Sequence, residues 1–241
     1  MVARGEFIQQ LGRLAYEGRD VLSSVGWLSR VPEGFRDAML DIAIWRLAET
    51  GTEFIHNGVD KGGMFAVVRG SAETSLYLGH PDTRMIHVAG PGFWAGNRSL
   101  LGRTRQVALV AREEVLWGFF PQVRVEQLLA EEPSWWRHVC ELFDDAMLIC
   151  MGIMSDLSLQ DSRKRAVAIL LRAAGCRYDD PALGMKAFIG LSQADLAAMG
   201  VMSRNTFNGI VSDLKSQGLI EHSYRNFAIP DPAALRALIE G

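Results

Sequence analysis

Apolar residues along the chain follow two different periods, and the change between them divides the sequence into parts. From residue 44 to residue 120, short segments rich in Val, Ile, Phe, Leu and Trp alternate with turns that contain glycine. Many short strands at this spacing are typical of an antiparallel sandwich or jelly roll. The predicted strands are Ile44–Leu47, Glu53–His56, Met64–Arg69, Ala72–Leu78, Met85–Ala89, Gln106–Ala111 and Val115–Phe120.

Helical patterns flank these predicted strands. Residues 1–23 are mixed in polarity and fit a helix whose role the sequence does not indicate. An amphipathic helix is expected from about Pro32, and Pro121–Glu132 predicts a short helix that turns Val125, Leu128 and Leu129 inward.

Pro133 begins a longer helix, expected from Ser134 to about Leu159. Its apolar residues include a series spaced alternately by four and three, which is a heptad seam: Trp136, Cys140, Phe143, Met147, Cys150, Met154 and Leu157. A second set forms another apolar face: Trp135, Val139, Leu142, Ala146, Leu148, Ile149, Met151 and Ile153. A helix that is apolar on two sides needs two partners. We expect one to be its own roll and the other the same helix of a second copy; packing on its own roll alone is the alternative.

The C-terminal part predicts two short helices joined by a turn. Ser192 suits the N-cap of the first, which Gly200 is expected to end in the C′ position. Ser203 suits the N-cap of the second, and Gly218 is expected to end it. The inward face of the second helix would be Phe207, Ile210, Val211 and Leu214. This is the helix-turn-helix pattern, and Gly218–Ile229 after it predicts a β-hairpin, or wing.

Two further helices complete this part. Arg163–Ala174 predicts a helix that Gly175 caps, with a loop over Cys176–Lys186 after it, and Asp231-Pro232 starts a short C-terminal helix.

Polar side chains gather on the first turns of the second helix: Ser203, Arg204, Asn205, Thr206 and Asn208. In this motif those turns meet base edges in the DNA major groove. Arg204 and Asn205 are the candidates for base contact, because Arg pairs with guanine and Asn with adenine. Ser203, Thr206 and Asn208 are candidates for base or phosphate contact, and Lys215 and Arg225 for phosphate contact. Helix pairs of this kind also occur in proteins that never touch nucleic acid.

The stretch resembles the DNA-binding domain of the Crp/Fnr family, whose recognition helix reads G-x-S-R-E-T-V-x-R and is followed by L-x-x-x-G-L-I. Here the frame begins at Gly200, contains Ser203, Arg204 and Thr206, and ends with Gly218-Leu219-Ile220. The family's Glu is Asn205 and its second Arg falls on Gly209. The resemblance implies a homodimer that pairs through the long helix and binds double-stranded DNA, with RNA polymerase as a further candidate partner.

The resemblance extends into the predicted roll, which is similar to the family's cyclic-nucleotide-binding-like domain. The run of Gly58, Phe65, Val67 and Gly70 and the turn of Pro91, Gly92 and Gly96 carry it.

In members that bind a cyclic nucleotide, this turn supplies a Glu for the ribose, and a later Arg binds the phosphate. The resemblance therefore implies an effector site at Gly96, Asn97 and Arg105, with Arg103-Thr104 as an out-of-register alternative to Arg105. Asn97 replaces the Glu, which removes a specific hydrogen-bond partner for the ribose. The alternative, which we favour, is that Arg98, Arg103 and Arg105 are exposed, solvated charges. The effector and any cofactor are unknown.

Composition limits the other possibilities. The 241 residues are 49% hydrophobic and 22% charged, which indicates a globular chain. The net charge is −3, yet residues 161–241 hold ten Lys/Arg against eight Asp/Glu, which weakly supports a DNA-facing C-terminal part. Three scattered cysteines provide no metal-binding spacing and suit a reducing cytoplasm. No signal peptide, membrane-spanning run or catalytic motif is evident, so we expect neither a membrane protein nor an enzyme.

Taken together, these patterns predict an α+β protein of three parts. Residues 1–132 would form an effector-sensing jelly roll, residues 133–160 a dimerisation helix, and residues 161–241 a winged helix-turn-helix. The predicted function is that of a transcriptional regulator that binds a palindromic operator as a homodimer. The alternative is a degenerate family member that mediates protein contacts without sequence-specific DNA binding, because Asn205 and Gly209 alter the usual DNA-facing surface.

Overall fold

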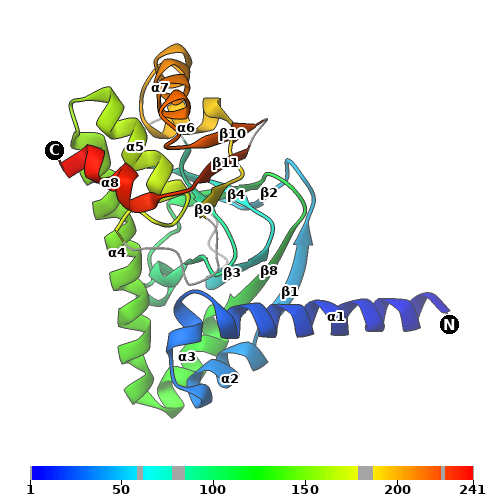
Figure 1. The fold of residues 1–241 in the computed structure, drawn as a ribbon. Coiled ribbons are helices and arrows are strands. Elements are labelled where there is room, and N and C mark those ends of the chain that lie inside the picture. The colour runs from blue at the N-terminus through cyan, green and yellow to red at the C-terminus, as the bar shows by residue number, and fades with distance from the viewer. Residues whose placement is uncertain (1, 59–61, 78–84, 179–186, 224–225, 241) are drawn as a thin grey trace. The chain divides into compact units, whose positions relative to one another are not determined.

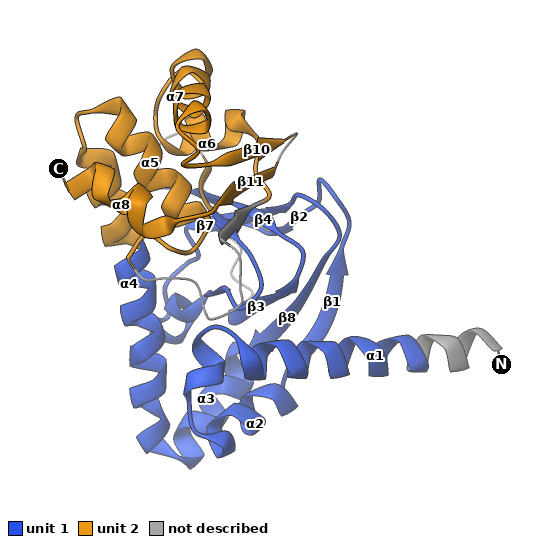
Figure 2. Ribbon diagram, in the orientation of Figure 1, with its two compact units in different colours: residues 1–83, 88–149 blue, residues 84–87, 150–241 orange. Residues whose placement is uncertain are grey.

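The computed structural model of the protein describes residues 2–58, 62–77, 85–178, 187–223 and 226–240 (Figure 1). The chain forms two compact units, each described separately below (Figure 2). The first contains residues 1–83 and 88–149, and the second contains residues 84–87 and 150–241. Among the described residues, no helix combines the length and the apolar character needed to cross a membrane.

Two four-stranded sheets form the roll that the sequence predicts. In hydrogen-bonded order, the first sheet contains β1 (Ile44–Ala48), β8 (Val115–Pro121), β3 (Gly63–Arg69) and β6 (Trp94–Ala95). The second contains β2 (Glu53–Ile55), β7 (Val107–Ala111), β4 (Ala72–Leu76) and β5 (Met85–Ala89). All seven predicted strands are confirmed to within about two residues; Leu78, the predicted end of β4, lies outside the described residues. The two-residue strand β6 was not predicted.

Strand β3 explains how the roll is packed, because both of its faces are buried. Met64, Ala66 and Val68 lie in an apolar cluster with the helices, whereas Phe65 and Val67 lie in a second cluster with residues of the other sheet. Successive side chains of a strand point to opposite faces, so one strand serves both clusters. The roll is therefore a sandwich with helices over one outer face.

Three helices of this unit match the sequence predictions: α1 (Val2–Ser24), α2 (Glu33–Asp41) and α3 (Gln122–Glu131). Val125 and Leu129 of α3 are buried and Leu128 is half-buried, as predicted. Short 3-10 helices at Trp27–Arg30, Asn97–Leu101 and Pro133–Trp135 were not predicted.

Helix α4 (Trp136–Ser158) is the predicted long helix, and its apolar residues divide differently from the prediction. Val139 and Leu142 are buried in the helix-side cluster of the roll, as the second predicted face requires. Leu148 and Met151, assigned to that same face, are instead 56% exposed. They broaden the exposed seam, whose members Met147 and Met154 are 54% and 71% exposed.

The second unit contains a three-stranded sheet and four helices that follow α4. The helices are α5 (Ser162–Ala173), α6 (Gln193–Met199), α7 (Arg204–Ser216) and α8 (Pro232–Glu240). The sheet has the order β10 (Glu221–Ser223), β11 (Asn226–Ile229) and β9 (Ala187–Ile189). The sequence predicted the β10–β11 hairpin and all four helices but not β9. Asp161 caps α5 by accepting hydrogen bonds from the backbone N–H groups of Arg163 and Lys164.

Candidate nucleic-acid interface

Helix α6 begins at the predicted N-cap. The Ser192 hydroxyl accepts a hydrogen bond from the backbone N–H of Asp195 at 3.2 Å, and the Asp195 carboxylate accepts one from the backbone N–H of Ser192 at 2.9 Å. This reciprocal pair is a capping box, which satisfies two N–H groups that have no partner within the helix. The first helix of the motif is therefore fixed at its start by its own sequence.

The end of α6 corrects the sequence prediction. Gly200 was expected in the left-handed C′ position, but it is the C-cap with φ −89°, and Val201 takes the left-handed conformation with φ +49°. The N–H of Met202 donates to the carbonyl of Ala197 and the N–H of Val201 to that of Ala198, both at 3.1 Å. These two bonds define a Schellman motif, in which glycine is the usual C′ residue.

Gly200 is closely packed, although its φ of −89° does not itself require glycine. A Cβ at position 200 would lie 2.7 Å from Cδ1 of Ile169 on α5, and the Gly200 carbonyl accepts a hydrogen bond from Nε of Arg165 at 3.0 Å. The G-x-S motif puts glycine two residues before the serine, and here that position is Val201. The sequence already contained this signal, because the chain reads G-x-x-S.

Helix α7 is capped and oriented as predicted. The Ser203 hydroxyl accepts a hydrogen bond from the backbone N–H of Thr206 at 3.1 Å. Phe207, Val211 and Leu214 are buried, and Ile210 is half-buried. Gly218, with φ +71°, follows the C-cap Gln217 and ends the helix.

The outward side of α7 carries most of the predicted contact residues. Ser203, Arg204, Asn205 and Thr206 are exposed, and so is Gly209, around which a Cβ would meet no atom within 4 Å. Asn208 differs: it is half-buried, and its Oδ1 is buried without a hydrogen-bond partner. Residue 208 follows Arg204 by four residues and so lies on the same side of the helix, but its side chain is less accessible than those of Arg204 and Asn205.

Charge on α7 favours a polyanion. Its one acidic residue, Asp213, pairs with Arg163 of α5. The exposed turns that contain Arg204 and Asn205 carry no acidic side chain of this helix. Phosphate groups near these turns would therefore meet no unpaired negative charge from α7.

The predicted wing is present as the β10–β11 hairpin, with Ser223 paired to Asn226. Phe227 is buried, and its ring centroid lies 4.3 Å from that of His222. Lys215 of α7 is exposed, and its Nζ donates to the His222 carbonyl at 3.3 Å, so this cation lies against the wing. Arg225, the other candidate for phosphate contact, lies outside the described residues.

Burial and a positive neighbour disfavour the charged form of His222. Burial first, and the Lys215 ammonium second, lower the pKa of the His222 imidazole below its usual value of 6.5. The wing therefore holds a neutral histidine at neutral pH.

The residues proposed for an effector lie in the roll, around the 3-10 helix that follows β6. Gly96 has φ +88°, and a Cβ there would collide with the carbonyl of Gly63, so only glycine suits the position. Asn97 is buried, with 7% exposure. The favoured alternative, that three arginines are exposed surface charges, is wrong for one of them. Arg98 and Arg103 are exposed, but Arg105 is half-buried with its guanidinium 5.5 Å from the ring centroid of Phe65.

Desolvation lowers the pKa of Arg105, whose guanidinium remains positive at neutral pH. Asn97 supplies an amide but no carboxylate at the turn. The arrangement places one half-buried cation near a glycine turn, and the identity of any ligand stays a prediction.

Comparison with known proteins agrees with this geometry. Residues 164–238 match a family described as the Crp-like helix-turn-helix domain. No curated protein sequence matches the chain.

Solved structures match over most of the chain at low sequence identity. FixK2 from Bradyrhizobium japonicum is 16% identical, with a TM-score of 0.69 over 82% of this chain and 97% of its own. A CRP/FNR-family transcriptional regulator from Thermus thermophilus, TTHA1359, is 18% identical, with a TM-score of 0.62 over 82% and 99%. The c-di-GMP-responsive global regulator CLP from Xanthomonas campestris is also 18% identical, with a TM-score of 0.62 over 82% and 99%. At these identities the likeness establishes the fold.

Proposed function

We propose that this chain, which carries a Crp-like helix-turn-helix domain on the fold of the CRP/FNR transcriptional regulators, is a DNA-binding regulator that acts as a homodimer. The observation that carries the proposal is the start of α7. Its N-cap is intact, its first turns expose Ser203, Arg204, Asn205 and Thr206, and its only carboxylate is paired with Arg163. An exposed, polar, carboxylate-free helix start is what a major groove accepts.

A homodimer is supported by the exposed seam of α4. Met147, Leu148, Met151 and Met154 are each more than half exposed on one contiguous stripe. An apolar stripe of this length on a helix marks an interaction site. A second copy of α4 would cover it, and twofold symmetry would then present two recognition helices to two half-sites about one helical turn apart, roughly 34 Å.

Within this role, Arg204 and Asn205 read bases, Ser203 and Thr206 contact bases or phosphate, and Lys215 and Arg225 hold phosphates. Asn208 contacts bases or phosphate through the exposed part of its side chain. The roll would sense an effector through the region of Gly96, Asn97 and Arg105, and RNA polymerase would be a further partner. Such a protein works in the cytoplasm, where its DNA lies.

The rival role, a protein-interaction module without DNA specificity, rests on Asn205 and Gly209. Both residues are exposed in the same place as the family's Glu and second Arg, so the side chains of this surface differ while the helix that carries them is retained. Asn205 and Gly209 would change which DNA sequence is preferred, but the capped start of the helix is retained. We therefore favour a regulator with its own operator sequence.

The test is selection of binding sequences from random double-stranded DNA, followed by affinity measurements across a salt series. Arg204→Ala should weaken binding to the selected sequence by about 1–3 kcal/mol and binding to random DNA little. Arg124→Ala, which removes an exposed arginine of α3 in the roll, is the matched control and should leave both affinities unchanged. Failure to select any sequence, or equal loss on both DNAs for Arg204→Ala, would contradict the proposal.

A further inference from the structure

Val201 combines two features that oppose each other. Among the described residues it is the one non-glycine residue with positive φ, and its side chain is 56% exposed. A β-branched residue is strained in this conformation, and glycine or asparagine would end α6 without that strain. Because the side chain is exposed, packing within the chain does not account for a valine here.

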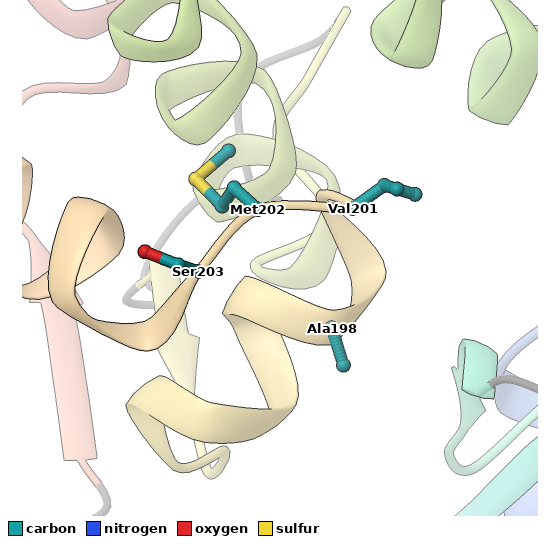
Figure 3. A pocket seen from close by; sticks show the side chains of 4 residues that line it. All are labelled: Ala198, Val201, Met202 and Ser203. Atoms are coloured by element: carbon teal, nitrogen blue, oxygen red, sulfur yellow. The ribbon is translucent and has the colours of Figure 1, made fainter.

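The surroundings of Val201 point toward the recognition helix. Ala198, Val201, Met202 and Ser203 line one open hollow at the turn between α6 and α7 (Figure 3). Ser203 is the N-cap of α7 and precedes Arg204 directly. The hollow therefore joins an apolar surface, formed by Ala198 and Val201, to the start of the polar face described above.

The docking geometry of this motif determines what the apolar surface would meet. The first helix crosses the DNA backbone and the N-terminal residues of the second contact base edges, so the turn between them lies where the chain enters the major groove. The base edges in that groove present one apolar substituent, the C5-methyl group of thymine. Side chains of alanine and valine size bury such a methyl group, whereas glycine or asparagine would not.

We propose that Val201, with Ala198 beside it, contacts a thymine methyl group in each half-site and contributes to the choice of sequence. The inference rests on the proposed function, because it requires α7 to dock in the major groove. It adds to that function an apolar contact with DNA, made by a residue of the turn between α6 and α7.

The experiment uses the full-length protein and the DNA sequence that it selects from a random pool. Each thymine of one half-site is replaced in turn by deoxyuracil, which removes only the methyl group, and affinities are measured for wild type, Val201→Ala and Val123→Ala. Val123, 64% exposed on α3 in the roll, is a matched control for an exposed valine. Val201→Gly is a second variant that keeps the turn without strain, should the alanine protein fold poorly.

We expect one uracil replacement to weaken wild-type binding about fourfold, the effect of one buried methyl-sized group. The same replacement should weaken Val123→Ala equally, should have a smaller effect on Val201→Ala, and should have almost no effect on Val201→Gly. A selected sequence that tolerates every uracil, that lacks A·T pairs, or that shows the same loss in the Val201 variants would overturn this inference and leave the proposed function intact. Failure to select any sequence would overturn both.

Discussion

Asp156 near the end of α4 accepts a hydrogen bond from Nε of Arg172 on α5 at 2.9 Å, and the aspartate side chain has no exposed surface. Nε of Arg177 donates to the other carboxylate oxygen at 3.0 Å. One buried anion thus serves two arginines that are themselves 9% and 15% exposed.

Removing that anion should destabilise the C-terminal unit strongly. Asp156→Ala would leave two largely buried guanidinium groups without their carboxylate, and breaking a buried pair in this way costs about 3–5 kcal/mol. Chemical denaturation of the full-length protein should register the loss. Asp144→Ala, at an exposed position of the same helix, should change stability by under about 0.5 kcal/mol. Equal effects of the two substitutions would mean that the ion pairs contribute nothing specific.

Substitution of Gly209, on the outward face of α7, should increase the stability of the protein instead of lowering it. Gly209→Ala should stabilise the protein by about 1 kcal/mol, because alanine favours the helix and its Cβ enters open space. Gly218→Ala also meets no neighbouring atom but stands at φ +71°, so it should cost about 1–2 kcal/mol. Thermal unfolding of wild type and the two variants measures the order of their stabilities. A destabilised Gly209→Ala protein would show that α7 is not a regular helix at this residue.

The exposed stripe on α4 makes a prediction about assembly. Met154→Glu would place a carboxylate in the stripe of both subunits of a twofold dimer, and burying these charges should raise the dimer dissociation constant about 100-fold or more. Sedimentation equilibrium over a concentration series measures it. Leu101→Glu, on a 58% exposed leucine of the roll, should leave assembly unchanged. A Met154→Glu protein that dimerises as tightly as wild type would exclude α4 as the dimer interface.

The fold was predictable where a period repeats over several turns or strands. Seven strands of the roll, the helices and both caps of the helix-turn-helix follow from alternation, heptad spacing and the serines at positions 192 and 203. Strands β6 and β9 contain two and three residues, and neither belongs to a predicted hairpin or to the series of predicted strands in the roll, as the equally short β10 and β2 do. Their strand character arises from hydrogen bonding to β3 and β11, and sequence periodicity does not record such tertiary pairing.

The site was predictable in its residues and less so in its detail. Local sequence identifies the polar first turns of α7, but it does not indicate that Ile169 lies against Gly200. By its spacing Asn208 belongs to the polar side of α7, and the sequence does not indicate that its Oδ1 is buried in the fold. Asp156 is one of several acidic residues in α4, and its two partners lie 16 and 21 residues further along the chain.

The wing histidine predicts a pH dependence with a defined sign. The pKa of His222 is lowered in the folded protein, so the unfolded chain binds a proton more readily as the pH falls below about 6.5. Folding stability should therefore be constant above that pH and should decrease below it. Burial also lowers the pKa of His87, to about 4, so it contributes to the same decrease. The measurement is therefore the difference between wild type and His222→Gln in denaturation at pH 7.5 and 5.5. A variant that loses as much stability as wild type over this range would exclude His222 as a contributor.

Val201 predicts a conflict between stability and binding. Asparagine adopts the left-handed conformation more readily than valine, and the exposed valine side chain loses little burial, so Val201→Asn should stabilise the protein by about 1 kcal/mol. The same change removes the apolar side chain proposed to meet thymine, so affinity for the selected DNA should fall while stability rises. A decrease in both would mean that the substitution disturbs the turn, and an increase in stability with unchanged affinity would mean that the strain serves no contact with DNA. An increase in folding stability together with a decrease in affinity for the selected DNA, measured on one preparation, would support a binding role for this strained residue. Residues kept for function commonly reduce stability in this way.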